Sequence, residues 1–88
     1  MFNFSIENIN RQRIKTIIFE KNILLIEYVS GFKYSYKNIS VYLIKDYLEL
    51  IIKGIKKNNF QVIDETIEKL FDILDDYPCT IESAEIAY

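Results

Sequence analysis

The chain has 88 residues and a formal net charge of −2, and half of its residues are hydrophobic. This composition excludes a disordered chain and predicts one domain with a modest core. There is no histidine, and Cys79 is the single cysteine. The chain therefore lacks the usual general base and the commonest metal ligand, and it cannot form an internal disulfide. We expect a protein that is not an enzyme and that has neither a cofactor nor a metal site.

Residues 1–10 lack a basic stretch followed by a long apolar run, so they do not resemble a signal peptide. The longest uninterrupted apolar run is far shorter than the ~20 residues that a membrane helix needs. A lone free thiol suits a reducing compartment. These features predict a cytoplasmic protein without a membrane partner. The abundance of Ile, Lys and Asn indicates AT-rich coding DNA, as in a bacterium, a phage or a mobile element.

The first forty residues are expected to form strands. Residues 2–6 are a candidate edge strand, and residues 13–20 are rich in β-branched side chains. Lys21-Asn22 is a two-residue turn signal before residues 23–29. That third segment is so apolar that we expect a central strand with both faces at least partly covered.

The next segment, residues 32–37, follows a turn signal at Ser30-Gly31 and alternates strictly. Phe32, Tyr34 and Tyr36 share one face, and Lys33, Ser35 and Lys37 share the other. The aromatic face is expected to lie under the helices as part of the core. These strands form a meander.

The remainder has helical periodicity. Residues 41–57 carry a broad apolar arc, which requires the sheet and a second helix or a partner as neighbours, and Ser40 is a candidate N-cap. A second helix is expected over residues 60–77 with its start at Asn58, followed by a tail at 78–88 that is either a short strand or a frayed end. The predicted fold of the single domain, residues 1–88, is α+β. It is an antiparallel three- to four-stranded meander followed by two helices packed on one face.

The net charge conceals a strong polarity. Residues 1–60 carry ten Lys or Arg and five acids, whereas residues 61–88 carry Lys69 and eight acids. On the second helix, six carboxylates fall within roughly 120° of arc, away from the apolar stripe. They are Asp64, Glu65, Glu68, Asp72, Asp75 and Asp76. One interpretation is a solvated outer face, with the first two acids near the favourable N-terminus; the other is a surface that binds a basic groove of a partner protein.

An alternative surface is basic. If the aromatic residues 32–36 face the helices, lysines and arginines of the first forty residues are expected to line the open face of the sheet and to contact phosphates. If the aromatic residues face solvent instead, they can stack bases. The candidates for nucleic-acid binding are Arg11, Arg13, Lys15, Lys33, Tyr34, Tyr36 and Lys37.

A family resemblance points the same way. The matching segments are Ile14–Ile17, Phe19-Glu20, Leu25–Tyr28, Ser30-Gly31, Tyr34–Tyr36, Asn38-Ile39 and Val41-Tyr42. Over about 40% of the chain, from Ile14 to about Leu48, the sequence resembles the KTSC domain, a small bacterial family that also occurs at the end of some lysyl-tRNA synthetases. The resemblance implies an RNA-binding role in which Tyr34 and Tyr36 match the central YxY motif. The chain departs from the family after Leu50, where an acidic helix replaces a small C-terminal segment.

Three functions remain open at this point. The first is an inhibitor that docks its acidic helix into the nucleic-acid groove of a partner such as a nuclease complex, in the style of phage-encoded anti-CRISPR proteins. The second is a KTSC-like module that binds RNA or single strands through the basic sheet. The third is a structural protein that forms a homodimer through the broad apolar arc of the first helix.

Overall fold

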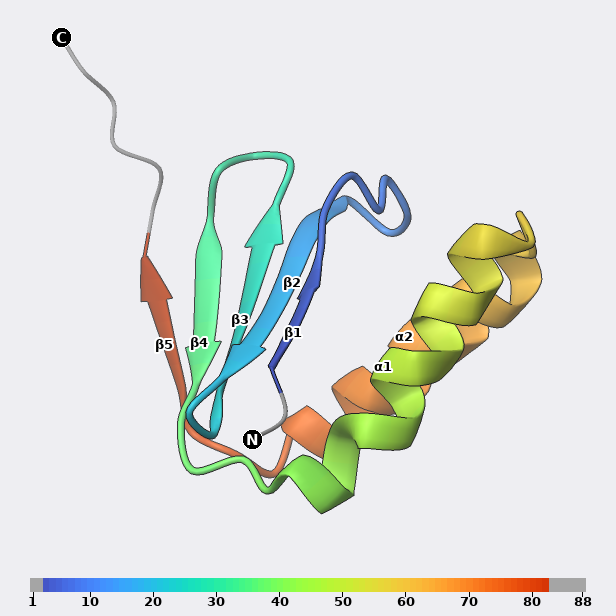
Figure 1. Cartoon of the computed structure of the whole chain (residues 1–88). Coiled ribbons are helices and arrows are strands. Elements are labelled where there is room, and N and C mark those ends of the chain that lie inside the picture. Colours follow the sequence, from blue (N-terminus) through green and yellow to red (C-terminus); the bar gives the residue numbers. More distant parts are fainter. Residues whose placement is uncertain (1–2, 83–88) are drawn as a thin grey trace, which may run out of the picture.

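The structure is a computed structural model that describes residues 3–82. Five antiparallel strands form one sheet in the order β1-β2-β3-β4-β5, and two helices lie together on one side of it (Figure 1). The strands are β1 (Phe4–Ile6), β2 (Ile14–Glu20), β3 (Ile23–Tyr28), β4 (Lys33–Tyr36) and β5 (Cys79–Glu82), and the helices are α1 (Val41–Lys56) and α2 (Phe60–Leu74). The predicted α+β class is confirmed.

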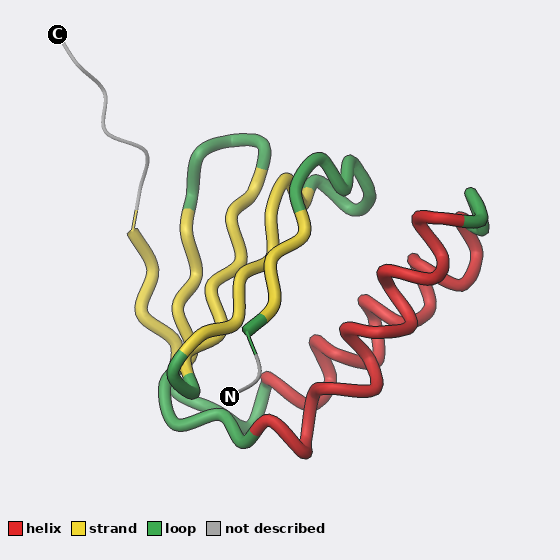
Figure 2. Tube along the Cα trace, in the orientation of Figure 1, coloured by secondary structure: helices red, strands yellow, loops and turns green. Residues whose placement is uncertain are grey.

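The sheet has one strand more than expected. After α2 the chain returns to the sheet, and β5 pairs with β4 so that Cys79 lies opposite Tyr36 and Glu82 lies opposite Lys33 (Figure 2). This strand occupies the first part of the predicted tail, residues 78–88. Residues 83–88 of that tail, and residue 2 of the predicted first strand, lie outside the described residues.

The predicted turns of the meander are confirmed. Lys21 and Asn22 both have positive φ angles, 52° and 62°, as the two-residue turns between twisted antiparallel strands require. Gly31 has a φ of 94°, a region that glycine enters without steric cost. The Tyr28 N–H donates a hydrogen bond to the Phe32 carbonyl at 2.9 Å across this turn.

Both helix starts are capped by side chains, one of them not at the predicted residue. Ser40 caps α1 as expected, since its hydroxyl accepts a hydrogen bond from the Tyr42 N–H. The cap of α2 is Asn59 rather than Asn58, which has a left-handed φ of 52° and belongs to the link between the helices. The carboxamide oxygen of Asn59 accepts a hydrogen bond from the Val62 N–H at 3.3 Å.

The helix α2 ends earlier than predicted, since the sequence indicated a helix over residues 60–77. The helix ends at Leu74, and Asp75 is its C-cap. Pro78 disfavours helical backbone at the residue before it, Tyr77, so the chain leaves the helix in a turn across residues 75–77. The Tyr77 N–H donates to the Leu74 carbonyl within this turn.

The core lies between the helix pair and one face of the sheet. Ile17, Ile26 and Tyr34 lie opposite one another in neighbouring strands and share this face. The fully buried side chains are Phe19, Ile14, Ile17, Leu24, Ile26, Ile39, Ile44, Leu48, Ile51, Ile63, Ile67 and Leu70. Their distribution over both helices, the strands β2 and β3 and the link before α1 shows that the two layers bury one continuous core.

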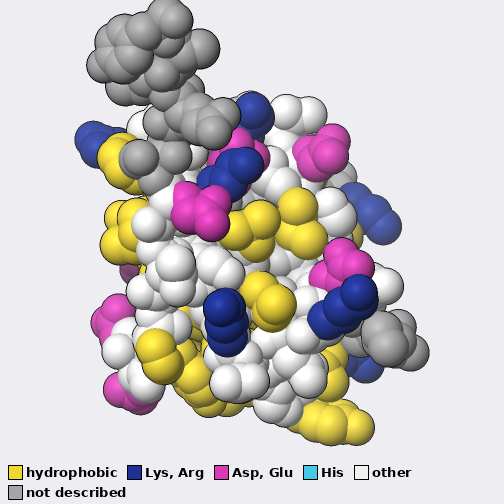
Figure 3. Space-filling view, turned by 90° about the vertical axis from the view of Figure 1, so that its left-hand side faces the viewer, with side chains coloured by type: hydrophobic (Ala, Val, Ile, Leu, Met, Phe, Trp, Pro, Cys, Tyr) yellow, Lys and Arg dark blue, Asp and Glu magenta, His cyan; other side chains and the backbone are white. Residues whose placement is uncertain are grey.

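The opposite face of the sheet is not covered by any described element, contrary to the expectation for residues 23–29. Ile18 and Leu25 face this side and are half-buried, and Ile23 is 39% exposed. Figure 3 shows hydrophobic side chains in the middle of this face with charges of both signs around them. Neighbouring side chains within the sheet therefore bury this face of the apolar strand β3 in part, without a covering layer.

The helices pack closely at Gly54. A Cβ at this position would lie 2.7 Å from Cγ1 of the buried Ile63, closer than real Cβ contacts. The absence of a side chain at Gly54 thus permits the observed spacing of α1 and α2.

We expect Gly54→Ala to destabilise the fold. Overpacking costs about 1–3 kcal/mol, whereas the better helix propensity of alanine returns only about 1 kcal/mol. Urea unfolding of both proteins measures the difference. In an Ile63→Ala background the substitution should no longer destabilise, because the space is free. An equal loss in both backgrounds would contradict the packing explanation.

Candidate functional site

The acidic face of α2 is the first candidate site. We use this name for Glu65, Glu68, Asp72, Asp75 and Asp76, all of which are exposed. At 100° per residue the first four occupy an arc of roughly 80°, opposite the buried Ile63, Ile67 and Leu70, and Asp76 follows in the turn after the helix. Within residues 3–82, no ion pair involves any of these five carboxylates. The face combines a high density of negative charge with full access to solvent.

Asp64, the sixth predicted member, has a different role. Arg11 binds it with both ends of the guanidinium, Nε to Oδ1 at 2.9 Å and Nη2 to Oδ2 at 2.5 Å. Both side chains are about one third exposed. Arg11 also lies over the ring of Phe60, 4.7 Å from its centroid. The pair therefore fastens the loop between β1 and β2 to the start of α2.

A second contact strengthens this attachment. The side-chain amide of Gln12 donates a hydrogen bond to the Asp64 carbonyl at 2.9 Å. Gln12 and Arg13 have positive φ angles, 50° and 64°, and form the tip of a tight turn between Arg11 and Ile14. Left-handed backbone is unfavourable for such side chains, so the contacts with α2 offset this cost and hold the turn in place.

The helix dipole does not explain the acids on α2. The first turn of α2 contains no acid, so the predicted favourable position of Asp64 and Glu65 is wrong. The last turn contains no base, and Asp72, Asp75 and Asp76 lie at the end where the dipole disfavours negative charge. By contrast, α1 carries Lys53 and Lys56 in its last turn. The acidic face is thus electrostatically unfavourable for α2 itself.

The predicted basic surface on the open face of the sheet is not assembled. Lys33 does face this side, but it lies between Glu27 of β3 and Glu82 of β5. Lys15 lies near the start of β2, and Lys37 directly follows the end of β4. Both are exposed, and they lie at opposite ends of the sheet. Arg11 binds α2, and Arg13 lies near the tyrosines of the other face. Acids interleave with the lysines, so this face carries no continuous positive potential.

Tyr34 and Tyr36 face the helices, as the core interpretation predicts. Tyr36 is only 9% exposed, and burial raises the pKa of its phenol. Tyr34 is half-buried, and its ring meets that of Tyr28 edge to face with the centroids 4.9 Å apart. Neither ring is available on the open face as a platform for bases.

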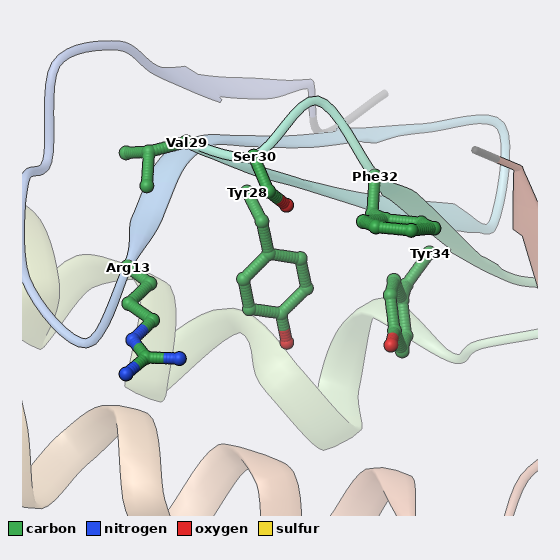
Figure 4. Close-up of a pocket in the computed structure, with 6 residues that line it drawn as sticks. All are labelled: Arg13, Tyr28, Val29, Ser30, Phe32 and Tyr34. Carbon is green, nitrogen blue, oxygen red and sulfur yellow. The ribbon is translucent and has the colours of Figure 1, made fainter. Parts of the chain in front are cut away.

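A pocket at one end of the sheet is the second candidate site. It has a volume of about 290 Å³ and is lined by Arg13, Tyr28, Val29, Ser30, Phe32 and Tyr34. Figure 4 shows the side chains of Arg13, Tyr28 and Tyr34 side by side, extending from the sheet in the same direction. Arg13 and Tyr34 are among the predicted binding residues, whereas Tyr28, which lies opposite Ile14 at the end of β3, is not.

The broad apolar arc of α1 finds its two neighbours within the chain. Ile44, Leu48 and Ile51 are fully buried, and Leu43 and Tyr47 are half-buried against the same core. The sheet and α2 therefore account for most of the arc. The homodimer through α1 stays a prediction.

Comparisons with protein-family models, with curated proteins and with solved structures give no match to the chain. The resemblance to the KTSC domain accordingly remains a prediction. No helix in the described part of the chain has both the length and the hydrophobicity to cross a membrane. Within residues 3–82, no three acidic or cysteine side chains lie close enough together to hold a metal ion.

The ion pair of Arg11 and Asp64 makes the stability of the fold depend on pH. Arg11 holds the pKa of the Asp64 carboxyl below its ordinary value of 3.8. A lowered folded-state pKa contributes stability that is complete above the unfolded pKa and is lost as the pH falls through the folded pKa.

We therefore expect Asp64→Asn to be less stable than the wild type at neutral pH, and the two proteins to converge at acidic pH as the pH falls through the lowered pKa of Asp64. Urea midpoints at several pH values measure this difference. Glu65→Gln, one residue further along the same helix, is the matched control and should show no such convergence. A difference for Asp64→Asn that does not change with pH would contradict the assignment.

Proposed function

We propose that the protein is a non-enzymatic inhibitor that docks the acidic face of α2 into a basic groove of a partner protein. The groove is one that otherwise holds nucleic acid, as in a nuclease complex of the kind that anti-CRISPR proteins block. The observation that carries this proposal is the row of five exposed carboxylates without an ion-pair partner among residues 3–82.

The spacing of the row supports nucleic-acid mimicry. At about 1.5 Å per residue, Glu65 to the C-cap Asp75 extend over about 15 Å along the helix, and Asp76 follows in the turn. Phosphates on one strand of a duplex rise by about 3.4 Å each, so five of them extend over about 14 Å. Five carboxylates thus occupy nearly the same length as five phosphates, and a groove that binds a strand can accept the helix in its place.

The energetics support a binding role as well. Like charges four residues apart cost a few tenths of a kcal/mol each, and acids at a helix C-terminus are unfavourable. Glu68 and Asp72 are one such pair, and Asp75 and Asp76 lie at the end of the helix. The arrangement lowers the stability of the free protein, whereas a basic groove would remove the repulsion. A charged surface of one sign also accelerates association with a partner of opposite sign.

The alternative, nucleic-acid binding by the open sheet face, has less support. Its central Lys33 has a glutamate opposite it on each neighbouring strand, and Arg11 is occupied by Asp64. Phosphate binding requires cations that are free to replace counterions. The sheet face therefore provides a weaker electrostatic footprint than the acidic face of α2.

Reversing two charges tests the proposal. We expect Asp72→Lys with Asp75→Lys to weaken binding to the native partner by about 100-fold or more, since close charge pairs at interfaces contribute about 1.5–7 kcal/mol each. The fold should persist, because a lysine near the helix C-terminus interacts favourably with the dipole. Partner isolated from the native host is titrated with each protein by calorimetry, and unfolding is measured in parallel.

The matched control is Glu7→Lys with Glu20→Lys, which changes the net charge equally at exposed positions outside α2. We expect this control to bind within a few-fold of the wild type. The wild type should also displace nucleic acid from the partner. Equal affinities for the two double variants, or partner and nucleic acid bound together, would overturn the proposal.

A further inference from the structure

The pocket beside the turn of residues 29–31 is lined by residues that have no role in the proposed function of the acidic face. Its walls are aromatic: Tyr28 and Tyr34 form its half-buried side, and Phe32 stands at its rim with 43% of its surface exposed (Figure 4). Its volume of about 290 Å³ is at the lower limit for a small-molecule site. The pocket therefore suits a small ligand with a flat ring system rather than a large ligand.

Polar groups that can donate hydrogen bonds converge on the same space. Arg13 supplies a guanidinium, and Tyr28, Tyr34 and Ser30 supply hydroxyls. Among the described residues, none pairs with the guanidinium of Arg13 or bonds to the hydroxyls of Tyr28 and Tyr34. The phenol of Tyr28 is a donor at neutral pH, and burial and the neighbouring Tyr34 raise its pKa further. Four donor groups and no acid line the pocket.

The backbone holds Arg13 in position for this role. Its φ of 64° is unusual for a long side chain, and such conformations persist where surrounding contacts enforce them. The carbonyl of Arg13 accepts a hydrogen bond from the Val29 N–H at 2.8 Å, which joins its turn to the turn of residues 29–31. The anchor of Arg11 and Gln12 on α2 fixes the other side of the same turn. Arg13 is thus presented from a fixed turn beside the two tyrosines.

We infer that this pocket binds a single nucleotide, with the base against the aromatic side chains and the phosphate on Arg13. The excess of donors favours phosphate over carboxylate, because a phosphate offers three terminal oxygens and pairs well with a guanidinium. Exposed aromatic rings stack on bases of any identity. The inference concerns a surface other than the acidic face of α2, and it holds or fails independently of the proposed function.

The test is a titration followed by amide chemical shifts. We expect adenosine monophosphate to saturate and to shift the amides of residues 28–34. Adenosine and inorganic phosphate, each lacking one half of the ligand, should bind at least about tenfold more weakly. A 5′-phosphorylated trinucleotide distinguishes the two possible ligands, a free nucleotide and the end of a nucleic-acid strand. Tighter binding than the free nucleotide assigns the pocket to a strand end, and weaker binding assigns it to free nucleotide.

Variants localise the effect. Arg13→Gln should weaken nucleotide binding by about tenfold or more, and Tyr34→Phe, which keeps the ring, by a few-fold. Lys33→Gln is the matched control, because it removes a charge from the residue beside Tyr34 on the opposite face, and it should bind within about twofold of the wild type. The dispersion of the amide spectrum shows that each variant is folded.

Three results would overturn the inference. The first is the absence of saturable shifts with adenosine monophosphate. The second is phenyl phosphate binding as tightly as the nucleotide, which would remove the base from the ligand. The third is an equal loss in Lys33→Gln and Arg13→Gln, which would indicate general charge attraction rather than this pocket.

Discussion

Burial of a single face of the sheet under the helix pair is the constraint on which the other features depend. Every fully buried strand residue that pairs within the sheet, including Ile17, Leu24 and Ile26, lies on this face. The helices must turn their apolar stripes toward it, which directs the opposite side of α2 to solvent. Close packing at Gly54 brings the two helices together as one layer. The exposed position of the acidic face is therefore a direct consequence of how the core is built.

The carboxylates of α2 form two groups, which differ in their position relative to the core. One carboxylate of α2, Asp64, lies at the edge of the buried stripe, and it serves the fold by binding Arg11. The remaining acids of the helix form no ion pair within the described residues, and only Glu65 has a side-chain partner there, since it accepts a hydrogen bond from the Gln61 amide at 3.0 Å. This distinction separates a structural charge from those available to a partner. It also links the two candidate sites, because the loop that Asp64 holds carries Arg13 into the tyrosine pocket.

The sequence was sufficient for the features that depend on local pattern. Alternation, helical periodicity and turn residues predicted the α+β class, four of the strands, both helices and the acidic arc. Features that depend on distant contacts were left open or missed. The strand β5 is a short polar segment whose pairing depends on where the chain returns after α2. Arg11 and Asp64 are 53 residues apart, so nothing local reveals their pairing. Arg13 was expected in the second strand and on the open face, and the tight turn that it forms with Gln12 contains neither glycine nor asparagine that would have revealed it.

The central claim is that the acidic face of α2 mediates attraction to a basic partner. Its most direct test is the association rate constant, measured by stopped flow with the native partner at increasing salt concentration. Electrostatic steering by five carboxylates predicts an association rate that falls steeply as ionic strength rises, while the dissociation rate changes much less. An association rate that does not respond to salt would contradict the account.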